Sequence, residues 1–332
     1  MRRSELQYLA CPRCLSDLNL HSITECHDDV LVNAKLECPS CSKEYPVLRG
    51  IPRFVSDEKY ASSFGFEWIK HAKTQYDSYS GLQLSEKRFF EETRWSRNLA
   101  GQVILEVGSG SGRFTEQAAS TGAFIVSMDY SCAVDANFES NGRKTNVLVV
   151  QGDVYQMPFR PESFDKVFCF GMLQHTPRVY KAFLALLTIL KGGGELAIDI
   201  YKKTFFTTIL STKYYVRLIT RRINPGELYR LTKQWVDLMW PICGIIGGIP
   251  RIGPSVNWRL LVADHRREGL RGNMLKEWAY LDTFDMIASY YDKPQTIQTV
   301  QRWFAGAGLL NVEVSYGYNG IVGRGRKPIC AA

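Results

Sequence analysis

The chain has 332 residues, of which 45% are apolar and 22% are charged, and its formal net charge is +8. These values indicate a soluble globular protein with one large and one small domain, or with two domains, and with enough chain to bury a sizeable core. The sequence also argues against a bilayer-spanning segment. Its longest uncharged apolar stretch, residues 238–250, is too short and contains two prolines and three glycines.

The first predicted element is built on two pairs of cysteines. The opening MRRSELQYLA lacks the apolar run of a secretory signal, so we expect a cytoplasmic protein with reduced or metal-bound cysteines. Cys11, Cys14, Cys38 and Cys41 form two Cys-x-x-Cys knuckles 23 residues apart, a little beyond the usual zinc spacing. Four thiolates complete the shell of a structural Zn²⁺, which we predict here. Two redox motifs are the alternative, but no thioredoxin-like context surrounds them.

The text "CPRC…CPSC…YPVLRGIPRF" resembles the small zinc-ribbon proteins that bind and activate methyltransferases. The resemblance covers roughly residues 5–55, so we predict a zinc-ribbon domain over residues 1–55. A closed four-thiolate site performs no chemistry of its own. The resemblance therefore implies a scaffolding or docking role.

Residues 56–100 are rich in aromatic side chains and predict a helical lead-in that covers the site described below. Over residues 101–201, apolar runs such as VILEV, FIVSMD and GELAIDI alternate with helical stretches, which predicts an α/β fold with a doubly wound parallel sheet. The alternation stops over residues 202–293, an insertion after the fifth strand that we expect to form a mostly helical lid. It resumes over residues 294–332 with a last helix and two strands.

A glycine-rich loop follows the first strand of this core. In LEVGSGSGRF, glycines stand at Gly108, Gly110 and Gly112, and Arg113 occupies the place of the third glycine in a dinucleotide fingerprint. The loop reads E-x-G-x-G-x-G, with Glu106 at the strand end. This spacing resembles the first motif of class I S-adenosylmethionine-dependent methyltransferases, and it implies a Rossmann-like methyltransferase sheet.

Further landmarks of that family follow in the family's order over residues 100–201. An acid at the end of the second strand accepts hydrogen bonds from a ribose, and the resemblance implies that an acid after the third strand meets the adenine. We therefore expect the cofactor S-adenosylmethionine to contact the glycine loop and six residues at strand ends, namely Asp129, Tyr130, Asp153, Val154, Phe170 and Gln174.

The segment after the fourth strand bears on the methyl acceptor. It reads GMLQHTP, without the Asn/Asp-Pro-Pro-Tyr/Phe that methyltransferases of exocyclic or amide nitrogens carry there. This favours an oxygen acceptor, and His175 is the candidate general base, against the alternative that it only packs. Gln75 and Asp77 of the lead-in are candidates for closing over the cofactor.

The predicted lid is strongly basic in its first part and polar in its last part. Residues 202–275 contain 13 Lys and Arg against 4 Asp and Glu, which indicates RNA, an acidic membrane surface or a phosphorylated substrate, or else a solvated face. The polar part, YLDTFDMIASYYDKPQT, is suited to bind sugar hydroxyls. Its candidate residues are Asp282, Asp285, Tyr290 and Tyr291.

Three functions are compatible with these patterns. The first is O-methylation of a small molecule, a sugar or a lipid-linked glycan in a biosynthetic pathway, by a cytoplasmic enzyme that can lie peripherally at a membrane. The alternative is an rRNA or tRNA methyltransferase that binds RNA through the zinc ribbon and the basic lid. A non-enzymatic assembly factor is the third, and the complete set of cofactor landmarks speaks against it.

Overall fold

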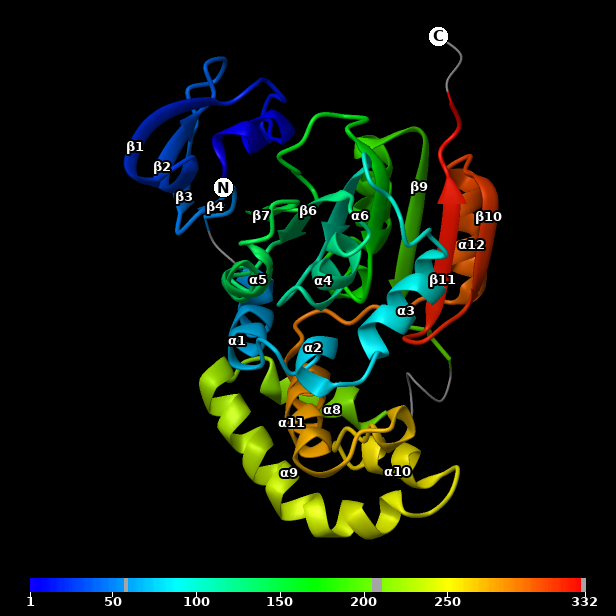
Figure 1. Cartoon of the computed structure of the whole chain (residues 1–332). Coiled ribbons are helices and arrows are strands. Elements are labelled where there is room, and N and C mark those ends of the chain that lie inside the picture. Colours follow the sequence, from blue (N-terminus) through cyan, green and yellow to red (C-terminus); the bar gives the residue numbers. More distant parts are fainter. Residues whose placement is uncertain (57–58, 205–210, 330–332) are drawn as a thin grey trace.

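A computed structural model describes residues 1–56, 59–204 and 211–329. Figure 1 shows a small sheet at one end, a large central sheet flanked by helices, and a group of helices at the other end.

The small N-terminal sheet has four antiparallel strands in the order β1-β2-β3-β4. It follows a short 3-10 helix, η1, and its strands are β1 (Asn19–His27), β2 (Val30–Glu37), β3 (Glu44–Leu48) and β4 (Ile51–Pro52), with η1 at Arg3–Tyr8. Tyr8 stacks on Phe124 of the large sheet, with ring centroids 4.4 Å apart. The Phe54 amide donates to the Gln151 carbonyl at 2.9 Å. The small sheet therefore packs against the large sheet and covers the edge formed by β7.

The large sheet has seven strands in the order β10-β11-β9-β8-β5-β6-β7. They are β5 (Val103–Val107), β6 (Phe124–Asp129), β7 (Val147–Gln151), β8 (Phe164–Cys169), β9 (Leu190–Ile200), β10 (Leu310–Tyr316) and β11 (Ile321–Arg326). The five strands of the predicted core are parallel. β11 runs antiparallel to both β9 and β10, because a short hairpin joins β10 to β11. The sheet is thus mostly parallel, with a reversed edge.

Helices cover both faces of this sheet, so its strands are apolar on both sides. Alternate residues of β5 show this, since Leu105 packs with α6 and α12, whereas Ile104 packs with α3 and α4. The helices of the core and of the lead-in are α1 (Ser62–Lys70), α2 (Asp77–Ser80), α3 (Leu84–Thr93), α4 (Arg113–Ala119), α5 (Val134–Asn141), α6 (Val179–Ile189) and α12 (Ile297–Gly306), with short 3-10 turns η2 (Lys59–Ala61) and η3 (Leu173–His175).

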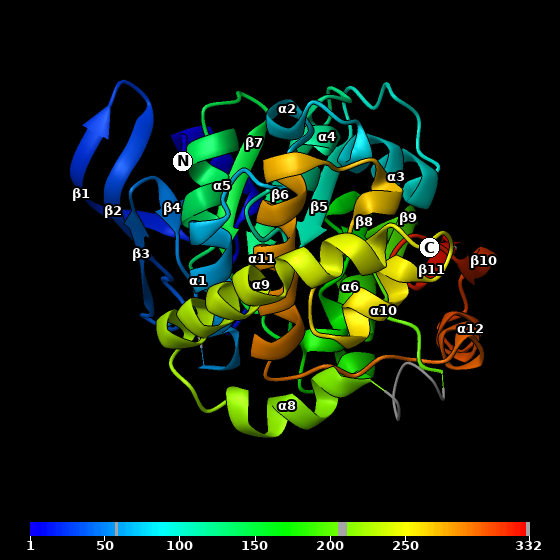
Figure 2. The ribbon, with the colours of Figure 1, turned by 90° about the horizontal axis from the view of Figure 1, so that it is seen from below.

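The insertion after β9 forms a helical layer across the carboxyl ends of the parallel strands. It contains α8 (Thr212–Thr220), α9 (Pro225–Gly247), α10 (Gly253–Arg259), η4 (Arg266–Glu268) and α11 (Gly272–Ala288). Viewed from this end, α8 to α11 lie in front of the central sheet (Figure 2). Among the helices in the described part of the chain, none is long and apolar enough to cross a bilayer.

Candidate active site

A cavity of about 710 Å³ lies between the central sheet and the helical layer. Its lining comes from five parts of the chain: the lead-in helices, the glycine loop, the ends of β6, β8 and β9, the lid, and the turn between β10 and β11. Ligands bind at the carboxyl ends of strands in open α/β sheets. This cavity is therefore the candidate active site.

The glycine loop forms one wall of this cavity. Gly108 and Gly110 line it, with φ angles of +83° and +54° that favour glycine. A Cβ on Gly108 would lie 2.4 Å from the Met172 Cβ. A Cβ on Gly112 would lie 2.1 Å from the Asn137 Oδ1, although Gly112 itself is not part of the lining. The loop therefore needs glycine both for its backbone angles and for close packing.

Glu106 stands behind the loop rather than in the cavity. Its Oε2 accepts a hydrogen bond from the Ser127 hydroxyl at 2.9 Å and another from Thr115. Asn137 donates to Ser127 at 2.8 Å and to the Ser109 hydroxyl at 3.1 Å. This buried network holds the loop from the side away from the ligand, so the geometry gives Glu106 a positioning role.

The ionisation of Glu106 yields a stability prediction. Burial raises the pKa of Glu106 to about 8, against the hydrogen bonds from Thr115 and Ser127, which lower it. The unfolded chain has a glutamate pKa of about 4.3, so the native state holds the extra proton, and stability falls as the pH rises from 4.3 to 8. We expect Glu106→Gln to remove this slope. Its thermal midpoint should exceed that of the wild type at pH 8 and match it near pH 4; equal slopes would contradict the assignment.

Asp129 ends β6 and lines the cavity. Its Oδ1 accepts from the Ser131 amide and hydroxyl, both at 2.8 Å, and its Oδ2 accepts from the Gly110 amide at 2.9 Å. A carboxylate offers about four acceptor positions, so Oδ2 keeps capacity for one hydroxyl of a ligand. The site fits a ribose on this observation.

The other residues predicted to contact the cofactor divide into two groups. Phe170 lines the cavity, edge-to-face with Phe114 at 5.4 Å. Tyr130 stacks on Tyr60 at 5.2 Å, outside the lining. The lining also lacks Asp153, Val154 and Gln174; the Asp153 carboxylate accepts from the Tyr155 amide at 2.9 Å.

His175 lies at the cavity wall just after β8, and its side chain is buried. Its Nδ1 is 2.8 Å from the Tyr291 carbonyl oxygen. A carbonyl only accepts, so Nδ1 carries the hydrogen and Nε2 carries the lone pair. Burial lowers the pKa of His175, opposed by the Asp285 carboxylate. The imidazole is therefore neutral near pH 7 and is suited to accept a proton.

Three of the six lead-in and lid residues predicted for the site face the cavity. Asp282, Asp285 and Gln75 line it, and the Gln75 amide donates to Asp282 at 3.3 Å. The remaining three, Asp77, Tyr290 and Tyr291, lie outside the lining. Both carboxylate oxygens of Asp77 accept backbone amides at the start of α3, at 2.8 and 2.7 Å.

The cavity also contains charged residues that the sequence patterns did not single out. Arg113 lines it and has no carboxylate within ion-pair distance in the described ranges, and burial, with Arg88, lowers its pKa to about 10. Glu67 is buried, and its Oε2 has no hydrogen-bond partner among the described residues. Burial, with Asp285, raises the pKa of Glu67 well above its usual range. The wall thus offers a cation and a neutral carboxylic acid to a ligand.

The basic residues of the lid are in part internal. Lys213 and Arg217 line the cavity, and both form ion pairs with the buried Asp292, at 2.8 and 2.5 Å. His265 pairs with Asp282 at 2.5 Å. Their positive charge is therefore partly offset inside the protein.

The four predicted zinc ligands meet at one end of the small sheet. Their Sγ atoms all lie within 4.8 Å of one another. The Sγ atoms of Cys11 and Cys41 are 3.6 Å apart, and those of Cys14 and Cys38 are 3.4 Å apart. Zn–S bonds of about 2.3 Å place tetrahedral sulfurs about 3.8 Å apart, whereas a disulfide needs about 2.05 Å. The arrangement fits a four-thiolate metal site.

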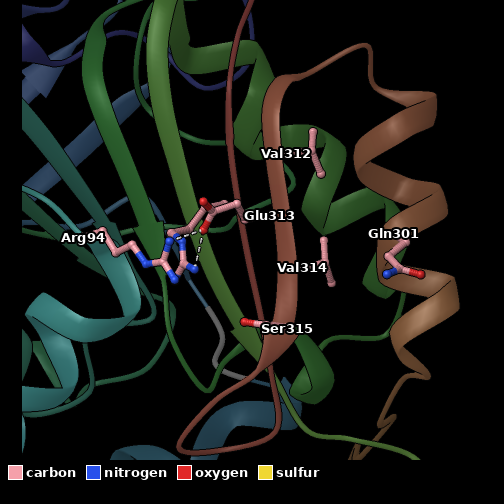
Figure 3. A pocket seen from close by; sticks show the side chains of 7 residues that line it. Arg94, Gln301, Val312, Glu313, Val314 and Ser315 are labelled. Atoms are coloured by element: carbon pink, nitrogen blue, oxygen red, sulfur yellow. Dashed lines mark hydrogen bonds and ion pairs between the residues drawn. The ribbon is translucent and has the colours of Figure 1, made fainter.

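A second hollow, of about 460 Å³, lies beside β10 at the opposite edge of the large sheet. Figure 3 shows Arg94 and Glu313 side by side, at their 2.6 Å ion pair, with Gln301 approaching from α12. None of the residues predicted for the active site lines this hollow.

Residues 105–198 match the sequence model of a methyltransferase domain family. The chain is 29% identical over 150 residues to a "ubiquinone biosynthesis O-methyltransferase" of Pseudomonas fluorescens. The matched region covers 41% of this chain and 65% of that protein. The chain thus covers slightly less than two thirds of that relative. A chloroplastic methyltransferase of Arabidopsis thaliana is 22% identical over 267 residues, 73% of this chain and 74% of that protein.

Two solved structures share a low similarity with this chain. One is a complex of the Haloferax volcanii Trm112 methyltransferase activator with a methyltransferase, at a TM-score of 0.47 and 13% identity, covering 81% of this chain and 99% of that chain. The other is human N-acetylserotonin methyltransferase, at 0.46 and 11%, covering 81% of this chain and 57% of that chain. Residues 105–198 therefore match the sequence model of a methyltransferase domain, and this segment carries the parallel strands β5 to β9 of the large sheet.

Proposed function

We propose that this protein transfers the methyl group of S-adenosylmethionine to a hydroxyl of a small, polar acceptor held between the core and the lid. The observation that carries the proposal is the shared cavity, since Gly108 and Asp129 line it on one side and Asp282 and Asp285 on the other. The name of the Pseudomonas relative supports an oxygen acceptor. Transfer of a labelled methyl group to a hydroxylated metabolite tests the proposal.

The cofactor would lie against the glycine loop. Asp129 would accept a ribose hydroxyl through Oδ2, and Arg113 would hold a carboxylate, since it is the cation in the described cavity wall nearest the loop without an ion-pair partner. Trp68 would close the site from α1, because its indole packs against the loop: a Cβ added to Gly110 would lie 3.1 Å from the indole Nε1.

Asp129→Ala tests the cofactor assignment. We expect the affinity for S-adenosylmethionine to fall about tenfold to a hundredfold, the usual value of a hydrogen bond to a charged group. Asp165→Ala is the matched control, because Asp165 lies at the amino end of β8, away from the cavity at the carboxyl ends of the strands, and it should leave the affinity unchanged. Isothermal titration calorimetry measures both. Unchanged affinity in Asp129→Ala would refute the ribose assignment.

His175 would act as the base for the transfer. The bound cofactor supplies an electrophilic methyl group on a sulfonium. With the cofactor and acceptor bound, His175 Nε2 would take the hydroxyl proton of the acceptor as its oxygen receives the methyl group. The bond from Nδ1 to the Tyr291 carbonyl fixes the tautomer, and Asp285 favours the imidazolium that results.

The lid side of the cavity favours an acceptor rich in hydroxyls. Asp282 and Asp285 provide acceptors, and the neutral carboxyl of Glu67 provides a donor. A sugar or another polyhydroxylated metabolite would satisfy all three groups. The RNA alternative has less support, because Lys213 and Arg217 of the basic segment line the cavity and share the Asp292 carboxylate, so they do not lie on an open surface.

Zinc would bind to Cys11, Cys14, Cys38 and Cys41 and would hold the small sheet together. The buried apolar residues of that sheet belong to the same cluster as residues of β5, β6 and β7. The small sheet would thus act as a brace for the free edge of the catalytic core, held by contacts such as the 2.7 Å ion pair of Arg53 with Asp135.

A further inference from the structure

The long lid helix α9 carries an apolar face on the outside of the molecule. Seven large apolar side chains are exposed at intervals of four and three residues, so they follow one side of the helix and its continuation. We call this set the outer stripe, and its members are Leu231, Trp235, Leu238, Ile242, Ile245, Ile249 and Ile252. Ile245 is 79% exposed and Leu238 is 70% exposed. An exposed apolar surface of this kind marks an interaction site.

No member of the outer stripe belongs to the apolar clusters of the described lid, although the Trp235 indole donates a hydrogen bond to the Leu260 carbonyl at 3.1 Å. The opposite face of α9 is the one that packs on α11, through Leu228 against Phe284 and through Val236 against Ala279. The stripe is therefore a second apolar face, additional to the one that stabilises the lid.

Helix α8 has its polar face inside and its apolar face outside. Arg217 and Thr220 are buried, and they donate to the carbonyls of Met286 and Ile287, both at 2.7 Å. Leu218 and Ile219 point outward, 60% and 70% exposed. The outward side of α8 is therefore apolar at two neighbouring positions where a solvated helix usually carries polar side chains.

The charges around these faces are mostly basic. Residues 238–250 contain no charged side chain. Four exposed basic residues without an ion pair in the described parts of the chain border the stripe and α8, namely Arg221, Arg222, Lys233 and Arg251. The neighbouring acids are paired, since Asp237 is 2.6 Å from Lys276 and Glu227 is 3.7 Å from Arg230.

We propose that α8 and α9 dock this protein peripherally on an anionic lipid bilayer. The outer stripe would lie at the boundary between headgroups and acyl chains, and the four basic residues would contact the headgroup phosphates. RNA would satisfy the basic residues but would leave the stripe in water. In Figure 1 the lid lies at the end of the molecule opposite the small sheet, so docking leaves that sheet free.

Vesicle flotation tests the proposal. The full-length protein should float with vesicles of phosphatidylcholine containing about 30% phosphatidylglycerol at about 0.1 M salt, and much less with pure phosphatidylcholine. Leu238→Glu/Ile245→Glu should lower the partition coefficient at least tenfold. Arg221→Gln/Arg222→Gln should lower binding to the anionic vesicles only. The control Leu48→Glu/Leu310→Glu replaces two exposed leucines far from the lid and should bind like the wild type.

Three outcomes would overturn the proposal. The wild type fails to float with anionic vesicles; or light scattering shows a dimer that Leu238→Glu/Ile245→Glu dissociates, with no vesicle binding; or RNA binds and competes for the same basic residues while the stripe variant keeps full vesicle binding. S-adenosylmethionine binding to each variant verifies its fold. Docking and methyl transfer are independent, because the replaced residues lie outside the cavity lining.

Discussion

Replacing His175 with glutamine is expected to lower kcat for methyl transfer by about 10²–10⁴-fold, the range that general-base catalysis supplies. Glutamine can donate a hydrogen bond to the Tyr291 carbonyl, as the imidazole does at 2.8 Å, but it cannot take a proton. The dissociation constant of S-adenosylmethionine should stay within about twofold of the wild type, because the residues proposed to hold the cofactor are unchanged.

The pH profile separates this role from a packing role. Burial lowers the pKa of His175, so the wild-type rate should fall on the acid side only below the ordinary histidine value of about 6.5. His175→Gln should lose that acid limb. Gln174→Leu is the neighbouring control, since Gln174 is buried and does not line the cavity. A His175→Gln enzyme that keeps more than half of kcat would leave His175 with a packing role only.

Replacing Cys38 with serine is expected to unfold the small sheet and to cause the largest loss of stability in the chain. Structural zinc contributes roughly 10–16 kcal/mol to the folding of small zinc modules, and three thiolates leave its shell incomplete. Because Tyr8 and Phe54 contact the large sheet, loss of the small sheet exposes the free edge of β7. We expect a lower thermal midpoint for the whole protein and aggregation on heating.

Cys26→Ser is the matched control, because Cys26 belongs to β1 of the same small sheet but not to the four-cysteine cluster. Mass spectrometry of the intact protein, which measures the bound metal, should find one zinc per chain in the wild type and in Cys26→Ser. It should find none in Cys38→Ser. A metal-free wild type as stable as the metal-loaded protein would exclude a structural zinc site.

The sequence predicted those parts of the molecule that depend on local pattern. Asp129 ends its strand and Gly108 follows another strand. Because the carboxyl ends of parallel strands meet at one edge of the sheet, the sequence predicts that both residues lie near one ligand site. The two cysteine knuckles also depend on local pattern, since each directs two sulfurs to one point. In the structure the four sulfurs lie close together.

The sequence could not predict what depends on contacts between distant segments. Lys213 and Arg217 belong to a basic segment of the sequence, but in the structure both form ion pairs with Asp292, some 75 residues later. Glu106 carries the acid of the motif, yet its side chain turns away from the cavity toward Ser127. Pattern and spacing fix the position of a residue along its strand, but its partners are set by packing.

The central claim is methyl transfer to a hydroxyl of a small, polar acceptor in the cavity between core and lid. The most direct test is transfer of radioactive methyl from S-adenosylmethionine into a cell extract, separated afterwards into small molecules, lipid-linked glycans, protein and RNA. The account predicts label in a small-molecule or glycan fraction, carried as a methyl ether and abolished by His175→Gln. Label in RNA or protein, or label that His175→Gln leaves intact, would contradict it.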